Sequence, residues 1–128
     1  MRRRLRKAHR MLAVQAELGR LAEWRLSDLE RQASDLTDQR RDLLRFLDGE
    51  LVFSGLFAAT MMRRLHGLEE SGAVLNGRTE AQAARSLEEQ GRLRRVERMV
   101  KAVECEARRV DDARQLVEAI EIALNRLA

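Results

Sequence analysis

A heptad series in the first third of this chain constrains its fold more than any other feature. Apolar residues recur there at alternating steps of three and four, the spacing that turns one face of an α-helix toward a second helix. The thirteen positions are Leu5, Ala8, Leu12, Gln15, Gly19, Ala22, Leu26, Leu29, Ala33, Leu36, Arg40, Leu43 and Leu47. Only Gln15, Gly19 and Arg40 interrupt the apolar stripe. The series predicts a long helix with a coiled-coil seam.

The last third of the chain carries a second series of the same kind. Its positions are Leu93, Val96, Val100, Val103, Ala107, Val110, Ala113, Val117, Ile120, Leu124 and Leu127. The step from Val110 to Ala113 is one residue short, which locally overwinds a supercoil without ending it. The 128 residues include no proline, so nothing prevents very long helices. We therefore predict an all-α protein whose residues 1–128 form one domain, a long antiparallel helical hairpin or two-helix coiled coil.

The first predicted helix covers about residues 3–68. The heptad phase continues past Leu47 to Leu68 after one four-residue stutter. Asp48-Gly49 is the weak point of this helix. Because one glycine costs a helix only about 1 kcal/mol, we expect a kink or a short interruption there and not a chain reversal.

The chain reversal is predicted at about residues 70–78. Ser71-Gly72 and Asn76-Gly77 are typical turn dipeptides in this stretch. Thr79, followed three residues later by Gln82, has the spacing of a capping box. These signals predict a second helix over about residues 79–127.

The two predicted helices have unequal lengths, which leaves the N-terminus without an internal partner. Paired backward from the turn, the shorter second helix leaves about twenty N-terminal residues uncovered. An apolar stripe without an internal partner is usually a binding surface. We predict that a partner protein contacts this overhang through Arg3, Arg4, Leu5, Met11, Leu12, Val14, Leu18 and Leu21, with Ala8 in the same stripe.

Two further features of the predicted seam have alternative interpretations. Arg40 either sets the helix register by pairing with an acid on the second helix or extends its guanidinium into solvent. All three phenylalanines fall within residues 46–62, which form either a locally thickened core or a docking patch.

No catalytic, cofactor-binding or metal-binding constellation is found in the sequence. His9 and His66 are far apart and are predicted to be surface residues. The single cysteine, Cys105, cannot form an internal disulfide, which fits a reducing cytoplasm. The longest apolar run, residues 51–62, is well short of the ~20 residues that cross a bilayer, so no membrane span is expected.

Two stretches resemble the FliJ family of flagellar type III export. They are AVQAELGRLAEWRLSDLERQ near the start and RLRRVERMVKAVECEARRVDDARQ near the end. Both belong to an Arg/Glu-rich, proline-free hairpin of similar length. The resemblance implies a small cytoplasmic stalk protein, likened to the rotary ATPase γ subunit, that inserts into the export ATPase ring and contacts the export gate.

The sequence thus predicts a non-enzymatic coiled-coil stalk or adaptor of the flagellar type III protein export apparatus, without a cofactor. A second interpretation is a structural protein that homodimerises into a four-helix assembly through its apolar overhang. A third is a nucleic-acid-binding hairpin, because the first ten residues carry six basic side chains and no acid. These basic residues have no interleaved aromatics, so no specific nucleic acid is expected as a partner.

Overall fold

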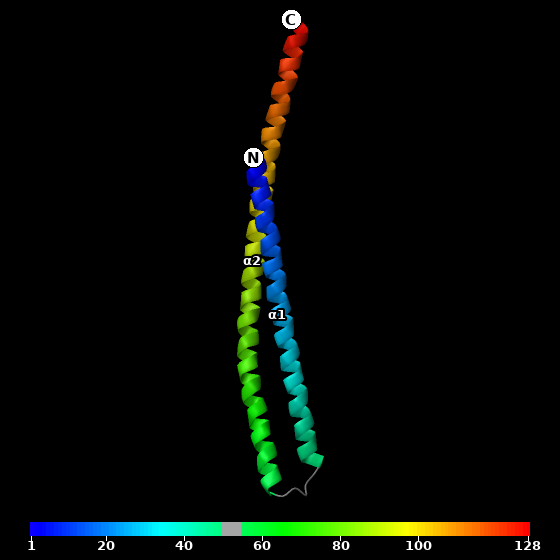
Figure 1. Ribbon diagram of the computed structural model, residues 1–128, viewed down its shortest axis with the longest axis vertical. Helices are drawn as coiled ribbons and strands as arrows, with labels where there is room; N and C mark the ends of the chain where they lie inside the picture. Colours follow the sequence, from blue (N-terminus) through cyan, green and yellow to red (C-terminus); the bar gives the residue numbers. More distant parts are fainter. Residues whose placement is uncertain (50–54) are drawn as a thin grey trace. The chain divides into compact units, whose positions relative to one another are not determined.

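The computed structural model describes residues 1–49 and 55–128, and over these residues the protein is all-helical. Helix α1 runs over Arg2–Gly49 and helix α2 over Gly55–Leu127 (Figure 1). The two helices pack antiparallel as a helical hairpin, and the described part of the chain contains no strand. The predicted fold class is confirmed.

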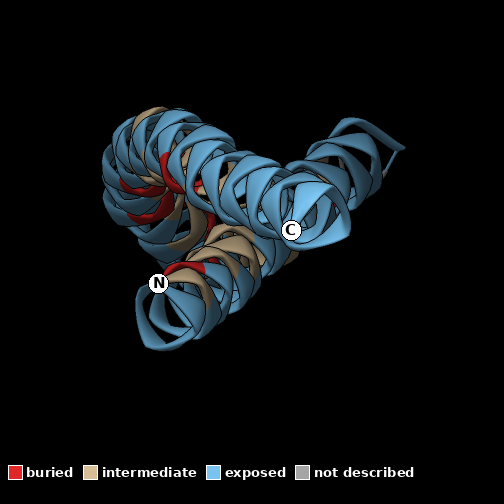
Figure 2. Ribbon diagram, turned by 90° about the horizontal axis from the view of Figure 1, so that it is seen from above, coloured by how far each residue is buried: buried red, intermediate tan, exposed pale blue. Residues whose placement is uncertain are grey.

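The seam of α1 lies where its heptad series places it. Twelve of the thirteen predicted positions are buried or half-buried, and the exception is Arg40. Buried and half-buried residues lie on the sides where the two helices face each other (Figure 2). The spacing of apolar residues therefore correctly predicts which face of α1 is covered.

One compact unit of the hairpin combines Met1–Gly19 with Glu88–Ala128. Its core contains Ala8, Val100 and Val103, whose exposed fractions are 3%, 4% and 6%. Leu5, Leu12 and Val96 pack against this cluster. Ala8 of α1 thus packs with two valines of α2 in one apolar cluster.

The second compact unit is Arg20–Leu87. Its buried apolar residues are Ala22, Leu43, Leu65 and Leu75. Gln82 is also buried, and its Nε2 donates a hydrogen bond to the backbone carbonyl of Ala22 at 3.0 Å. A polar side chain is tolerated in this seam because its amide has a partner.

Arg40 satisfies part of each alternative predicted for it. Its Nη2 lies 3.4 Å from Oε1 of Glu69 on α2, so it does pair with an acid of the second helix. The Arg40 side chain nevertheless remains 53% exposed. Exposed pairs of this kind contribute at most about 1 kcal/mol to stability, so the Arg40–Glu69 pair does little to fix the register of the two helices.

The aromatic cluster of residues 46–62 is described in part. The rings of Phe46 and Phe57, from α1 and α2, lie 6.1 Å apart and are tilted by 58°. This is favourable aromatic packing between the helices, but Phe46 is 43% exposed, so the thickened core and the docking patch both stay predictions. Phe53 and its neighbours at 51 and 52 lie outside the described residues.

The predicted position of the chain reversal is wrong. Residues 70–78 are helical and belong to α2, and the chain reverses between Gly49 and Gly55. The first helix therefore does not extend to residue 68, and the second does not begin at 79. Thr79 is no helix cap, since its hydroxyl donates to the carbonyl of Leu75 at 2.8 Å within α2.

The physical reason is that a single heptad phase continues through the region predicted to be a turn. Leu68 and Val96 are 28 residues apart, which is four complete heptads. The positions that continue the phase between them are Gly72, Leu75, Thr79, Gln82, Ser86, Glu89 and Leu93, all buried or half-buried. Most of these side chains are polar or small, so the apolar stripe fades while the seam continues. The isolated glycines cost a helix only about 1 kcal/mol each.

Candidate protein-binding surface

The last part of α2 has no helix packed against it within its own unit. The ion pair between Arg4 and Glu106, at 3.1 Å, joins the start of α1 to α2, and Ala107 is still half-buried. All residues from 108 to 127 are exposed. We call residues 108–127 the α2 extension; Figure 1 shows α2 continuing past the N-terminus of α1.

The α2 extension exposes large apolar side chains at heptad spacing. Their exposed fractions lie between 36% and 85%, for Val110, Leu116, Val117, Ile120, Ile122, Leu124 and Leu127. Most of these residues belong to the second predicted heptad series, which is confirmed as a seam only as far as Ala107. A heptad stripe that continues beyond the end of its partner helix is a surface against which another helix can pack.

The predicted N-terminal overhang is therefore wrong. Leu5 and Leu12 pack in the core cluster around Ala8, and Arg4 pairs with Glu106. The error follows from the position of the reversal, because a chain that reverses between Gly49 and Gly55 pairs its N-terminus with residues just above 100. The uncovered end of the longer helix then belongs to α2.

The other predicted partner-binding residues lie on the surface. Met11, Val14 and Leu18 are 43%, 60% and 44% exposed, and Leu21 is 43% exposed in the other unit. Arg3 lines a surface hollow of about 630 Å³ together with Arg6, His9 and Arg10. A binding role for these residues stays a prediction.

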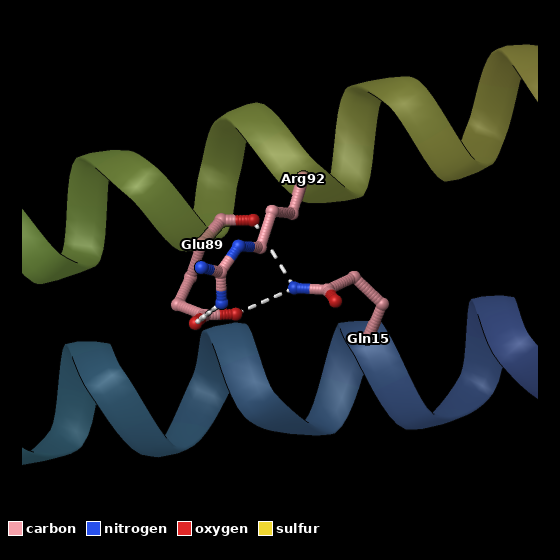
Figure 3. Close-up of polar contacts among 3 residues, drawn as sticks. All are labelled: Gln15, Glu89 and Arg92. Carbon is pink, nitrogen blue, oxygen red and sulfur yellow. Dashed lines mark hydrogen bonds and ion pairs between the residues drawn. The ribbon is translucent and has the colours of Figure 1, made fainter.

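A polar cluster joins the two helices where Gln15 interrupts the apolar stripe (Figure 3). Its Nε2 donates to Oε2 of Glu89 at 2.6 Å and to the Glu89 backbone carbonyl at 3.3 Å. Arg92 donates to Oε1 of the same carboxylate at 3.0 Å. Glu89 thus accepts from both helices, and the cluster favours one register of α1 against α2.

Replacing Gln15 with alanine is expected to lower the free energy of unfolding by about 1 kcal/mol, because the half-buried hydrogen bonds to a carboxylate are lost. Gln32→Ala is the matched control, because the exposed Gln32 donates a hydrogen bond to Asp28 within α1 itself. That change should cost less than about 0.5 kcal/mol. Urea titrations followed by circular dichroism measure both values, and equal losses would contradict a register role for Gln15.

The two histidines have acidic partners that sequence reasoning did not assign. His9 Nε2 lies 2.9 Å from Oε1 of Glu104, and His66 Nε2 lies 3.0 Å from Oε1 of Glu70. The second pair has i,i+4 spacing, which the sequence displays directly. The first could be found only once the helix register was known.

Among residues 1–49 and 55–128, no group of three or more His, Cys, Asp or Glu side chains could hold a metal ion. Cys105 is a free, exposed thiol. Neither described helix contains a stretch apolar and long enough to cross a membrane.

Comparisons with known proteins give no identification. No protein-family model, no curated protein and no solved structure matches this chain. The fold therefore defines a class, the antiparallel helical hairpin, and any narrower assignment is a proposal.

Proposed function

We propose that the protein is a non-enzymatic coiled-coil adaptor that binds another helical protein through the α2 extension. The observation that carries this proposal is the row of exposed apolar side chains on residues 108–127. Leaving such a row in water is unfavourable by about 25 cal/mol per Å² of apolar surface, so cover by another helix stabilises it.

The rest of the hairpin suits an adaptor because it holds the extension in one helical phase. Helix α2 is 73 residues long and continues without a break from the packed seam into the extension. A partner bound at the extension is therefore connected to the seam by continuous helix. Such a connection can transmit a displacement along α2 from one bound protein to another.

We further propose that this adaptor is a cytoplasmic stalk of a bacterial flagellar type III export apparatus. The support is the resemblance of residues 13–32 and 92–115 to the FliJ family, together with the hairpin fold. In this role the hairpin couples the export ATPase ring to the export gate. The exposed Met11, Val14 and Leu18 are then candidate contacts with the ring, and the α2 extension contacts the gate.

Removal of residues 108–128 is expected to abolish binding to the gate component while residues 1–107 remain folded. The reason is that the removed residues are exposed and the core around Val100 is untouched. Isothermal titration against the purified export ATPase and the purified gate protein of the source bacterium measures both interactions. The triple change of Met11, Val14 and Leu18 to serine is the complementary variant, which should weaken ATPase binding alone.

Motility of a deletion strain completes this test. Complementation with the full chain should restore flagella, and complementation with the truncated chain should not. Normal flagella in the deletion strain, together with no binding to either purified protein, would refute the export assignment and leave the adaptor function to be tested with other partners.

A second candidate, nucleic-acid binding, has one observation in its favour. Arg3, Arg6 and Arg10 lie together around the hollow at the start of α1. Against it, Glu106 pairs with the neighbouring Arg4 at 3.1 Å and offsets its charge. The net positive surface is therefore smaller than the sequence suggests.

Any binding to DNA is expected to be weak and to vanish at physiological salt. Six phosphate contacts give a slope of about −5 in a plot of log affinity against log salt concentration, and ion pairing of Arg4 reduces it. Fluorescence anisotropy with labelled duplex and single-stranded DNA at about 20 and 150 mM salt measures the slope. Sequence-selective binding that persists at the higher salt would favour the nucleic-acid function instead.

A further inference from the structure

We infer that the α2 extension pairs with the α2 extension of a second copy of this chain, in antiparallel orientation. The second copy occupies the surface that the proposed function assigns to a helical partner protein, so self-association and binding of that partner compete for residues 108–127.

The spacing of the exposed seam reads the same in both directions. Its positions are Val110, Ala113, Val117, Ile120, Leu124 and Leu127, separated by steps of three, four, three, four and three. Two such helices placed antiparallel, with the two-fold axis between residues 118 and 119, bring every seam residue opposite a seam residue of the other copy. Val117 then faces Ile120, Val110 faces Leu127, and the small Ala113 faces the large Leu124. The interface is self-complementary in position and in side-chain size.

The charges beside the seam distinguish the two orientations. Arg114 and Glu121 each follow a seam residue directly, on the same flank. In the antiparallel pair, Arg114 of one copy lies beside Glu121 of the other, and symmetry repeats this attractive pair. In a parallel, in-register pair, Arg109 of one copy lies beside Arg114 of the other, which places like charges together.

The opposite flank of the extension adds apolar contact in the antiparallel arrangement. Leu116, which is 62% exposed, lies beside Ala123 of the second copy. None of the ion pairs found among the described residues uses Arg114 or Glu121, so both side chains can take an intermolecular partner.

The heptad phase of α2 changes at the point where α1 stops covering its seam. The shortened step from Val110 to Ala113 falls just past Ala107, the last half-buried seam residue. A shortened step turns the apolar stripe around the helix. The stripe of the extension is thus phased separately from the stripe that α1 covers, as a second interface requires.

The size of the interface predicts a weak dimer. Eighteen paired residues extend over about 27 Å, and a two-stranded contact of that length buries less than a standard interface of about 1,600 Å². We therefore expect a dissociation constant on the order of 10 µM. Sedimentation velocity of the purified full chain between 1 and 200 µM, as a rough working range around that value, should show a monomer–dimer equilibrium.

The single cysteine reports the orientation. Cys105 is exposed and can carry a nitroxide spin label. The antiparallel register places the two Cys105 backbones 27 residues apart along the axis, or roughly 40 Å. A parallel pair would place them within about 20 Å. Pulsed electron–electron double resonance, at a concentration that populates the dimer, distinguishes these two distances.

Charge reversal tests the register without disturbing the hairpin. Arg114→Glu should weaken the dimer at least about 5-fold, because it turns two attractive pairs into repulsive ones. The double variant Arg114→Glu with Glu121→Arg should restore the dissociation constant to within about 2-fold. Ile120→Arg removes a central seam residue and should abolish the dimer, whereas Leu87→Arg, at a 67% exposed residue of α2, should leave it unchanged.

Three outcomes would overturn the inference: a monomer throughout the concentration range, a short Cys105–Cys105 distance, or failure of the double variant to restore association. Circular dichroism of each variant should show unchanged helix content, so that loss of the dimer is not loss of the fold. These experiments use the purified chain alone. Their failure leaves the proposed adaptor function intact, because that function is tested by titration against other proteins.

Discussion

Val100→Asp is expected to unfold the unit of Met1–Gly19 and Glu88–Ala128, whereas Val117→Asp is expected to leave its stability unchanged. Both valines occupy α2 seam positions, and both changes carry the same helix-propensity cost. They differ in how far each valine side chain is buried. Val100 is 4% exposed in the core with Ala8, and Val117 is 53% exposed on the α2 extension.

The expected difference follows from the cost of burying a carboxylate without a partner. An aspartate at position 100 must either be desolvated among apolar groups or force α1 away, and we expect a loss of at least about 3 kcal/mol. Thermal and urea unfolding at about 1 µM, below the concentration at which the proposed dimer forms, measures both variants. Similar losses at the two positions would mean that α1, or another part of the chain, covers the extension.

The sequence predicts the face of α1 because that information is local. Each residue of the series, from Leu5 to Leu47, is placed by its own helix, and twelve of the thirteen positions are indeed covered. The antiparallel hairpin follows for the same reason: two such stripes in one proline-free chain have each other as the nearest partners.

The position of the reversal is not local information, and the local signals misled the prediction. Ser71-Gly72 and Asn76-Gly77 have turn chemistry but lie within α2, because each glycine costs less than the packing gained from a continued seam. Asp48-Gly49, predicted to be a kink or a short interruption, is where α1 ends. The decisive signal was the 28-residue separation of Leu68 and Val96, which shows that both apolar stretches belong to one helix phase.

The sequence predicts an uncovered stripe at the N-terminus, whereas the structure leaves residues 108–127 of α2 uncovered. The longer helix does leave an apolar stripe uncovered, and this stripe is the α2 extension once the reversal is placed between Gly49 and Gly55. The partners of Gln15 and Gln82 could not be predicted, since Glu89 and the Ala22 carbonyl are found only when the helix register is fixed. A polar residue in a seam indicates that its side chain has a hydrogen-bond partner, but the sequence alone does not identify that partner.

The glycines of α2 give the sharpest test of where the chain reverses. No described glycine has a positive φ, and a Cβ added at Gly67 or Gly77 meets no atom within 4 Å. Both are exposed residues of a continuous helix. Gly77→Ala should therefore raise the free energy of unfolding by about 1 kcal/mol, since alanine loses less backbone entropy than glycine on entering a helix.

Gly77→Pro should have the opposite effect, lowering the free energy of unfolding by about 3 kcal/mol or more. Proline removes a backbone hydrogen bond of α2, and its ring clashes with the preceding turn of the helix. If residues 70–78 formed a turn instead, proline would be tolerated there and alanine would gain little or lose stability. Urea unfolding of the two variants and the parent chain decides between these cases, because the sign of each change, and not only its size, depends on whether position 77 lies inside a helix.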